Sequence, residues 1–171
     1  MENYLLVDGY NVINDWSDLK QIAKTNLEDA RDGLIEIMVE YKHYSGDYVI
    51  VVFDAHMVKG NNSKKKNIKG VEVIFTKENQ TADSYIEKRV NELMKNRRNV
   101  VRVATSDWAE QQVVLGSGAT RVSSRELKIE LDSVMKKIHT KTKEMRKVRS
   151  TLEERIKGEI VEKLEKWRRK Q

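Results

Sequence analysis

Two runs of apolar residues predict buried β-strands in the first third of the chain. Residues 3–8 contain Tyr-Leu-Leu-Val, and residues 48–53 read Tyr-Val-Ile-Val-Val-Phe. Unbroken apolar runs of this length are typical of strands covered on both faces, as in parallel sheets. Residues 71–75 alternate between apolar and polar positions, which predicts a more exposed strand. Residues 99–104 and 119–122 predict two further strands.

Helical periodicity fills most of the intervals between these runs. Apolar residues recur at helical spacing from Leu27 to Tyr41, and Gly46 ends the pattern. Thr25-Asn-Leu-Glu28 precedes it with the spacing of a capping box. A second helix is predicted from Gln80 or Thr81, with Tyr85, Ile86, Val90 and Leu93 on its inner side.

The last third of the chain predicts three more helices. One runs from Ser106 to about Leu115 and ends at Gly116-Ser-Gly118; a second follows the capping box Ser123-Ser-Arg-Glu126; the third starts at Thr151. The order of elements predicts an α/β fold with a mostly parallel central sheet, helices on both faces and C-terminal basic helices. We expect a domain over 1–148 and a basic helical extension over 149–171.

Positive charge gathers in the final third. Residues 1–120 hold 16 Lys and Arg against 18 Asp and Glu, whereas residues 121–171 hold 17 against 9. Lys64, Lys65 and Lys66 form the centre of a second basic segment. Such segments beside a neutral or acidic body favour a polyanionic partner, with the three lysines as candidate substrate-binding residues. The alternative is a solvated loop and a solvated helix face.

Composition excludes several classes of protein. The chain has no cysteine, so thiolate catalysis, Cys-ligated zinc and a disulfide scaffold are excluded. The N-terminal residues lack the positive charge and apolar length of a signal peptide, and no segment predicts a membrane span. We therefore expect a cytoplasmic protein, whose oligomeric state the sequence does not indicate.

Candidate chemistry lies where the predicted strands end. Asp8, Asp54 and Asp107 follow three strands, and Asp83 lies in the first turn of the helix before the fourth strand. In open α/β sheets the site lies beyond the carboxyl ends of the strands, so the fold brings these four acids to one edge. Clustered carboxylates repel one another unless a cation neutralises them, and Mg²⁺ or Mn²⁺ with a phosphodiester substrate suits such a cluster.

Each acid also has a purely structural interpretation. Asp83 and Asp107 can be first-turn residues favoured by the helix dipole, and Asp54 can order a loop together with His56. Asp8 is harder to explain in this way, because an acid at the end of an apolar central strand is unfavourable unless something uses it.

Other candidates carry less chemistry. His43, His56 and His139 have no spacing that makes a metal site. Gly116-Ser-Gly118 lacks the third glycine of a nucleotide fingerprint and is better explained as a helix C-cap. Trp16 and Trp108 can stack on bases, but buried anchors are the commoner use of tryptophan.

The motifs around the four acids resemble those of NYN domains, which belong to the PIN-like nucleases. The matching segments are Leu6-Val-Asp8-Gly-Tyr-Asn11, Val52-Phe53-Asp54, Thr81-Ala-Asp83 and Ala104-Thr-Ser-Asp107. The YacP-like branch is the most similar, through Asp54-Ala-His56, Phe75-Thr-Lys77-Glu78-Asn79 and Gly116-Ser-Gly118-Ala. The resemblance covers about residues 4–130 and implies a three-layer NYN fold.

The resemblance also implies a function. It implies an endoribonuclease in which Asp8, Asp83 and Asp107 hold Mg²⁺ or Mn²⁺, and Asp54 is a further ligand or a partner of a ligand. Asn11 would orient a water or a phosphate. Relatives in this branch are linked to ribosome-associated mRNA cleavage, so mRNA and the ribosome are the implied partners. The chain lacks a well-placed extra helix carboxylate of the broader PIN pattern, which argues against a second metal site.

The resemblance implies roles for two hydroxyl residues as well, since Thr105 and Ser106 could bind the scissile phosphate. Two other functions stay open. A non-catalytic RNA or ribosome binder would keep the fold and the basic charge. A receiver-like phosphorylation switch also gathers acids at strand ends, but it would want paired acids after the first strand, where this chain has Gly9 and Tyr10.

Overall fold

The computed structural model describes residues 2–54, 65–77, 79–107, 111–112, 115–137, 140, 142–145 and 160. The chain divides into two compact units, Met1–Leu131 and Asp132–Gln171. The sheet and the candidate site belong to the first unit. The predicted domain boundary between 148 and 149 lies outside the described residues and stays a prediction.

A six-stranded sheet forms the centre of the first unit, in the order β3-β4-β2-β1-β5-β6. The strands are β1 (Asn3–Asp8), β2 (Tyr48–Phe53), β3 (Lys65–Ile68), β4 (Val71–Phe75), β5 (Val100–Ala104) and β6 (Thr120–Val122). Every neighbouring pair is parallel except β3 and β4, which form an antiparallel hairpin. The prediction of an α/β fold with a mostly parallel sheet is confirmed.

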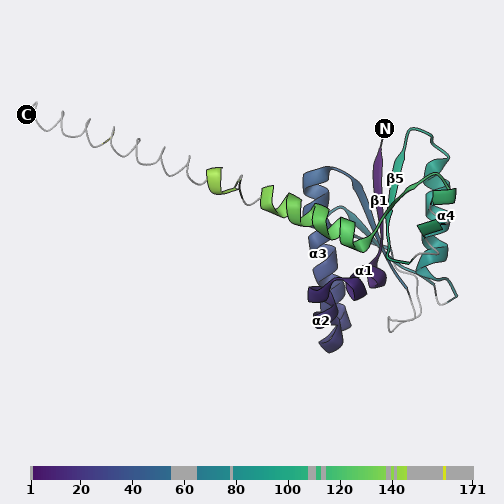
Figure 1. Cartoon of the computed structure of the whole chain (residues 1–171), viewed down its shortest axis with the longest axis horizontal. Helices are drawn as coiled ribbons and strands as arrows, with labels where there is room; N and C mark the ends of the chain where they lie inside the picture. Colours follow the sequence, from purple (N-terminus) through teal and green to yellow (C-terminus); the bar gives the residue numbers. More distant parts are fainter. Residues whose placement is uncertain are drawn as a thin grey trace, which may run out of the picture. The chain divides into compact units, whose positions relative to one another are not determined.

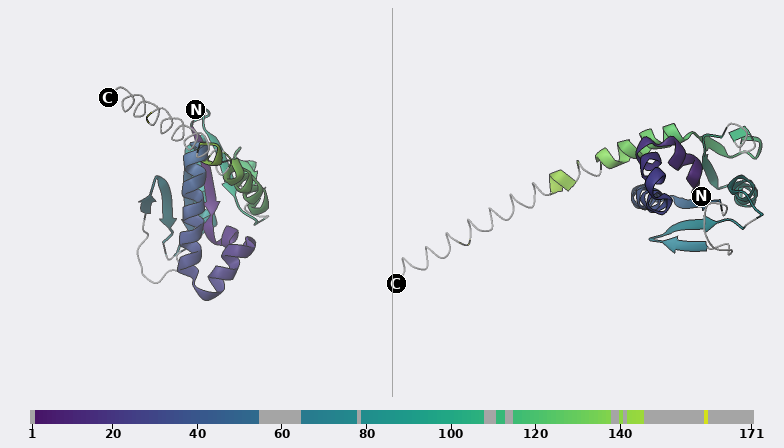
Figure 2. Two further views of the ribbon diagram at one scale, coloured as in Figure 1. Left: turned by 90° about the vertical axis from the view of Figure 1, so that its left-hand side faces the viewer. Right: turned by 90° about the horizontal axis from the view of Figure 1, so that it is seen from below.

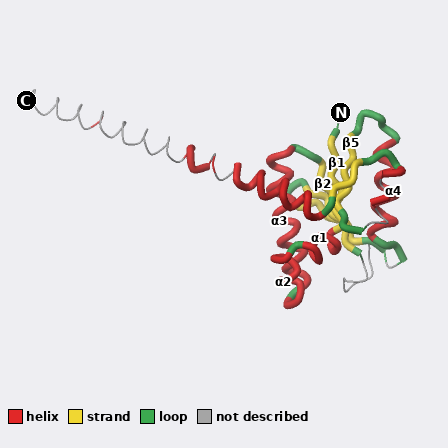
Figure 3. The backbone as a smooth tube through the Cα atoms, viewed as in Figure 1, coloured by secondary structure: helices red, strands yellow, loops and turns green. Residues whose placement is uncertain are grey.

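Helices cover both faces of this sheet, as Figures 1 and 2 show. The helices are α1 (Gly9–Asp15), α2 (Ser17–Thr25), α3 (Leu27–Ser45) and α4 (Ala82–Met94). Helix α4 contacts β1, β2 and β5 from one side, and α1 and α3 contact the sheet from the other. Figure 3 shows the three layers as helix, strand and helix. None of the described helices is long and apolar enough to cross a bilayer.

The core between the sheet and α4 explains why the central strands are unbroken apolar runs. It contains side chains from β1, β2, β4, α4 and β5 and from the residue before β6, which are Leu6, Ile50, Val52, Ile74, Ala82, Ile86, Val90, Leu93, Val101, Val103 and Ala119. The alternate residues of the same strands face α1 and α3, so β1 and β2 are buried on both faces. Burying one such side chain stabilises a fold by roughly 1.5–3 kcal/mol.

Sequence reasoning missed three elements of this fold and misplaced one helix cap. It missed α1 and α2, which fill the interval before α3, and it missed the exposed strand β3. The predicted capping box at Thr25–Glu28 is wrong, because Thr25 ends α2 and the side chain of Asn26 caps α3 by accepting from Glu28 N at 2.9 Å. The predicted stop at Gly46 is confirmed by its left-handed φ of 77°.

The helical segment that begins at Ser124 is fixed to the sheet by polar contacts. The predicted capping box at Ser123 and Glu126 is confirmed by reciprocal hydrogen bonds, at 2.7 and 3.2 Å. The Arg102 guanidinium on β5 pairs with Glu130 and donates to the Tyr41 hydroxyl, which in turn donates to Glu130 at 2.8 Å. These bonds hold the pKa of the Glu130 carboxyl below its usual range.

Gly9 is required by the packing at the end of β1. A Cβ built on Gly9 would lie 2.2 Å from Cε1 of Phe53, whose side chain is fully buried. We expect Gly9→Ala to lower the free energy of unfolding by roughly 1–3 kcal/mol, because a buried ring must shift. Urea unfolding measures this change.

Gly116 supplies the control for this prediction. Gly116 is helical and exposed, and a Cβ there meets nothing within 4 Å. Gly116→Ala should leave the free energy of unfolding unchanged or raise it by about 0.5–1 kcal/mol. Equal stability of the two variants would show that the Gly9–Phe53 contact is not restrictive.

Candidate active site

The carboxyl edge of the sheet gathers the residues singled out in the sequence. Strand β1 lies between β2 and β5, with Asp8 opposite Val52 and Val7 opposite Ala104. Chain order reverses at β1, because β2 lies on one side of it and β5 on the other. This is the switch point at which α/β sheets bind ligands. In Figure 1, β1 runs from the N-terminus to this edge, where α1 begins.

Asp8 is the most buried acid of the site. It ends β1, caps α1 by accepting from Asn11 N at 3.2 Å, and is 7% exposed. Burial raises the pKa of Asp8 to about 6, and the hydrogen bond from Asn11 N opposes this rise. The charges of Asp83, Asp54 and Asp107 raise the pKa further. Asp8 therefore lies within the electric field of the other three acids.

Asp83 lies at the start of α4, on the face of the sheet that this helix covers. It is the second residue of α4, whose first turn is fixed by Thr81 Oγ1 accepting from Ser84 N at 3.2 Å. Loss of hydration raises the pKa of Asp83, and the charges of Asp107 and Asp54 add to that effect. The predicted starting point of this helix, at Gln80 or Thr81, is confirmed by the Thr81 cap.

Asp54 and Asp107 complete the set. Asp54 directly follows β2 and is half-buried, whereas Asp107 lies exposed in the turn after β5. Asp107 N donates to Thr105 Oγ1 at 3.1 Å, and Asp107 O accepts from Gln111 N at 3.0 Å. The charges of Asp54, Asp83 and Asp107 therefore act on Asp8, and those of Asp54 and Asp107 act on Asp83, although the four acids come from four separate segments.

Asn11 joins two of these segments. Its Oδ1 accepts from Ser106 N at 2.6 Å, which ties the start of α1 to the turn after β5. The Ser106 hydroxyl also donates to Asp15 Oδ2 at 3.0 Å and lies 2.6 Å from the Ser124 hydroxyl. Ser124 is fully buried. Asn11 and Ser106 therefore set the distance between Asp8 and the loop that carries Asp107.

Thr105 lies behind this edge. It is fully buried, its N donates to Val122 O at 3.1 Å, and its O accepts from Gln111 Nε2 at 2.9 Å. Its hydroxyl accepts from Asp107 N, so the described contacts make Thr105 a support of the turn. The implied contact of Thr105 with a phosphate stays a prediction, and the burial of Thr105 does not favour it. Ser106, for which the same contact is implied, is exposed.

The predicted lysines divide between described and undescribed residues. Lys64 lies outside the described residues. Lys65 and Lys66 are exposed on β3, and Lys65 pairs with Ile74 near the carboxyl end of β4. This end of β3 therefore lies at the same edge of the sheet as Asp54. Lys65 Nζ forms an ion pair with Glu72 Oε1 at 2.9 Å.

Sequence reasoning missed Asp15, Gln111 and Ser124 as supports of the site. No local pattern indicates them, because each acts through a partner distant in the sequence or in a loop of irregular shape. Trp16 is confirmed as a buried anchor: it is 5% exposed, and its Nε1 donates to Ser124 O at 2.8 Å. Trp108, His56 and His139 lie outside the described residues.

The donor chemistry of the edge fits a hard divalent cation in part. Four carboxylates that repel one another, one of them buried, are stabilised in their charged form by a positive ion. Among the residues that the structure describes, however, no three acidic or imidazole side chains form a group that could hold an ion directly. The set therefore fits an ion that keeps several waters and few protein ligands, as Mg²⁺ commonly does.

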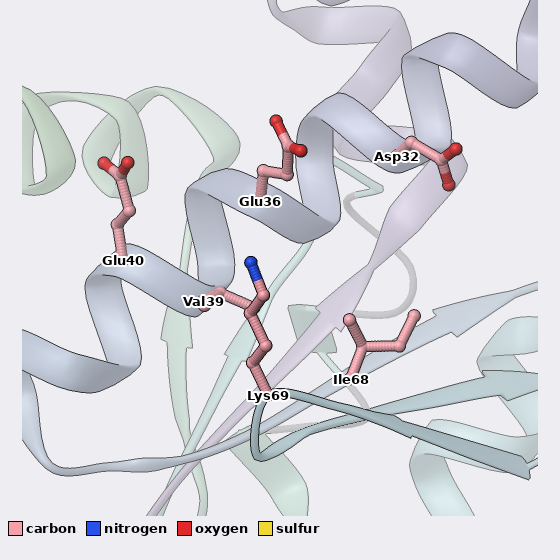
Figure 4. Close-up of a pocket in the computed structure, with 6 residues that line it drawn as sticks. All are labelled: Asp32, Glu36, Val39, Glu40, Ile68 and Lys69. Atoms are coloured by element: carbon pink, nitrogen blue, oxygen red, sulfur yellow. The ribbon is translucent and has the colours of Figure 1, made fainter.

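A surface pocket elsewhere has a different character. It has a volume of about 420 Å³ and lies between α3 and the β3–β4 hairpin, as Figure 4 shows. Its lining residues are Asp32, Glu36, Val39, Glu40, Ile68 and Lys69. Three carboxylates against one lysine disfavour a polyanion, so this pocket is not a second candidate for nucleic-acid chemistry.

Comparison with known proteins tests the resemblance. The family model described as the YacP-like NYN domain matches residues 5–169. The chain belongs to the YacP-like NYN domain family. A YacP protein of Bacillus subtilis (strain 168), described as uncharacterized, is 45% identical over 165 residues, which cover 96% of each chain.

Two solved structures share the fold of this YacP-like NYN domain. The crystal structure of Rae1 (YacP) from Bacillus subtilis is 44% identical, covers 97% of this chain and 94% of that chain, and has a TM-score of 0.74. Its W164L mutant is 45% identical, covers 85% and 84%, and has a TM-score of 0.72. The family and its NYN fold are thereby confirmed, and they support a nuclease-type, RNA-related function.

The burial of Asp8 makes stability depend on pH. Without metal, the folded state holds the Asp8 proton up to about pH 6, whereas the unfolded chain releases it near its ordinary value of 3.8. Stability therefore falls as pH rises from about 4 to about 6, because the folded state binds more protons. Asp8→Asn removes this effect and should raise the free energy of unfolding by up to about 3 kcal/mol at pH 7.

Urea unfolding in the presence of EDTA measures this difference across the pH range. The gain of Asp8→Asn over wild type should vanish near pH 4 and grow toward pH 7. Glu40→Gln is the matched control, because Glu40 is exposed near the end of α3, by the opposite edge of the sheet where β2 begins. A gain for Asp8→Asn that does not change with pH would contradict the assignment of a buried, charged carboxylate.

Proposed function

We propose that this YacP-like NYN domain is a cytoplasmic metal-dependent endoribonuclease that hydrolyses RNA phosphodiesters, with mRNA in association with the ribosome as its substrate. The observation that carries the proposal is the convergence of Asp8, Asp54, Asp83 and Asp107 at the switch point of the sheet. Family membership supports the nuclease class.

The four acids have different proposed roles, according to their positions. Asp8, Asp83 and Asp107 would hold Mg²⁺ or Mn²⁺, in part through waters that the ion keeps, and Asp54 would act as a further ligand or as a partner of one. When bound, such an ion lowers the pKa of a bound water and stabilises negative charge on the phosphate and the leaving oxygen. No histidine is required for this chemistry.

The chain's own residues prepare the site. The burial of Asp8 keeps bulk water from this carboxylate, so water screens the interaction of its charge with a bound cation only weakly. The Asn11–Ser106 hydrogen bond holds the β5 turn in place before substrate arrives, which avoids reorganisation during the reaction. Ser106 is exposed and would bind an oxygen of the scissile phosphate.

Charge outside the site supports a polyanionic substrate. The four carboxylates would repel RNA by themselves, so the backbone must be held by cations nearby. Residues 121–171 supply an excess of eight positive charges, from 17 Lys and Arg against 9 Asp and Glu. We propose that this basic segment binds ribosomal RNA.

Chelation and carboxylate replacement test the enzyme directly. Asp8→Asn and Asp83→Asn should each lower the rate of RNA cleavage by at least about a hundredfold, because they remove ion-holding oxygens. EDTA should abolish wild-type cleavage, and added Mg²⁺ or Mn²⁺ should restore it. Glu40→Gln should cleave as wild type does. End-mapped products from mRNA on translating ribosomes, and from the same mRNA alone, measure cleavage and its dependence on the ribosome.

The cleavage assay distinguishes the nuclease from a non-catalytic binder, and a mass measurement tests for a phosphorylation switch. Cleavage that survives EDTA would contradict metal dependence. A non-catalytic binder would associate with RNA in a salt-sensitive way and leave every end-map unchanged. A receiver-like switch would instead gain the mass of a phosphoryl group on incubation with a small phosphodonor.

A further inference from the structure

A group of aromatic rings lies at the same edge of the sheet, on the face covered by α1 and α3. Phe53 and Phe75, at the ends of β2 and β4, stack with ring centroids 5.5 Å apart. The Tyr10 ring packs against Phe53 edge-on, at 5.1 Å. Phe75 and Tyr10 are partly exposed, whereas Phe53 is fully buried. The group is therefore anchored in the core and open toward the edge.

Two cations from separate elements meet at Phe75. The Arg31 guanidinium of α3 lies 6.0 Å from the ring centroid, and Lys66 Nζ of β3 lies 5.8 Å from it. Arg31 Nη1 also donates to the Tyr10 hydroxyl at 3.0 Å. Both described partners of Arg31 are neutral, and this hydrogen bond uses one of the five N–H donors of a guanidinium. Two positive charges held near one ring favour an anion there.

Lys65 provides an internal comparison. Adjacent residues of a strand point to opposite faces, so Lys65 and Lys66 serve different surfaces. Lys65 lies opposite Ile74, which packs in the core beneath α4, and its charge is paired with Glu72. Lys66 lies opposite Val73, on the face of Phe75 and Arg31. Of the lysines predicted to bind substrate, we therefore assign Lys66 to this surface and leave Lys65, whose charge is paired with Glu72, outside it.

The cations lie beside the carboxylates and outside their cluster. Phe75 pairs with Phe53, and Asp54 is the next residue after Phe53. Burial raises the pKa of Tyr10, the Arg31 partner opposes this rise, and the negative charge of Asp54 adds to it. Tyr10 is thus subject both to the charge of Arg31 and to that of Asp54.

We propose that Arg31 and Lys66, held at Phe75 and Tyr10, form a phosphate-binding subsite for the backbone of single-stranded RNA next to the carboxylate centre. The identity of the ligand as RNA rests on the proposed function. The subsite binds a phosphate adjacent to the scissile one, on the β4 side of Asp54, and fixes the direction in which the strand crosses the edge.

Binding of the RNA backbone by the two cations rather than by the carboxylates is favoured on physical grounds. A guanidinium held by a ring and a hydroxyl is pre-oriented, so little conformational entropy is lost when it binds a phosphate. Carboxylates reject the same phosphate unless a cation is present. A strand bound across both groups is therefore held by the positive pair while the scissile phosphate faces the acids.

The test measures binding of a short fluorescent oligouridine in EDTA by anisotropy over a series of salt concentrations. Arg31→Gln and Lys66→Gln should each weaken binding roughly five- to tenfold at low salt and reduce the slope of log K against log salt by about 0.7, the loss of one phosphate contact. Lys65→Gln is the matched control and should keep the wild-type slope. An oligouridine with an uncharged methylphosphonate backbone should bind wild type and variants alike.

The outcomes distinguish the subsite from the enzyme. Equal slopes for Lys66→Gln and Lys65→Gln, or no salt-dependent binding by wild type, would overturn the subsite even if cleavage is observed. Loss of slope in Arg31→Gln and Lys66→Gln would support it even if no RNA is cleaved. Because Lys66 is exposed and its change leaves the core intact, the proposal can be refuted without relying on the folding of Arg31→Gln.

Discussion

The rest of the site depends on one buried carboxylate, because its charge at this edge of the sheet needs a positive partner. Asp8 ends the central strand β1, is almost inaccessible to water, and lies in the field of Asp54, Asp83 and Asp107. Burying an ionised acid beside like charges is unfavourable unless a positive partner relieves it. The fold nevertheless holds the four segments there, through parallel pairing of β1 with β2 and β5 and through the Asn11–Ser106 bond. Such a strained arrangement is typical of functional sites.

The edge is also divided by sign of charge. Strand alternation puts Asp8 on the side of α4, because its neighbour Val52 packs in the core beneath that helix. The same alternation puts Phe75, Lys66 and, through α3, Arg31 on the other side. Under the proposal, a polyanion that crosses the edge would meet the cations before the acids. Period-two alternation of the strands separates the proposed binding surface from the proposed reaction centre.

The features that sequence reasoning predicted correctly are those encoded locally. The unbroken runs at β1 and β2, the glycine stop at Gly46 and the Ser123–Glu126 capping box each depend on neighbouring residues, and each was predicted. The edge strand β3 was missed because Lys-Lys-Asn-Ile has no apolar signature. In the sequence Arg31 has the pattern of a solvated helix residue, and its contacts with Phe75 and Tyr10 arise only when α3 packs against the sheet. The acids at the strand ends were predictable from topology, whereas the Asn11–Ser106–Ser124 contacts join residues far apart and left no local pattern.

Direct binding of Mn²⁺, followed by electron paramagnetic resonance, tests the central claim without requiring an RNA target. Wild type and Glu40→Gln should show saturable binding that Mg²⁺ displaces, because the four acids lower the energy of a cation at the edge. Asp8→Asn should lose that binding while remaining folded. Mn²⁺ binding by Asp8→Asn equal to that of wild type, or no saturable binding by wild type, would contradict a cation site at the carboxyl end of β1.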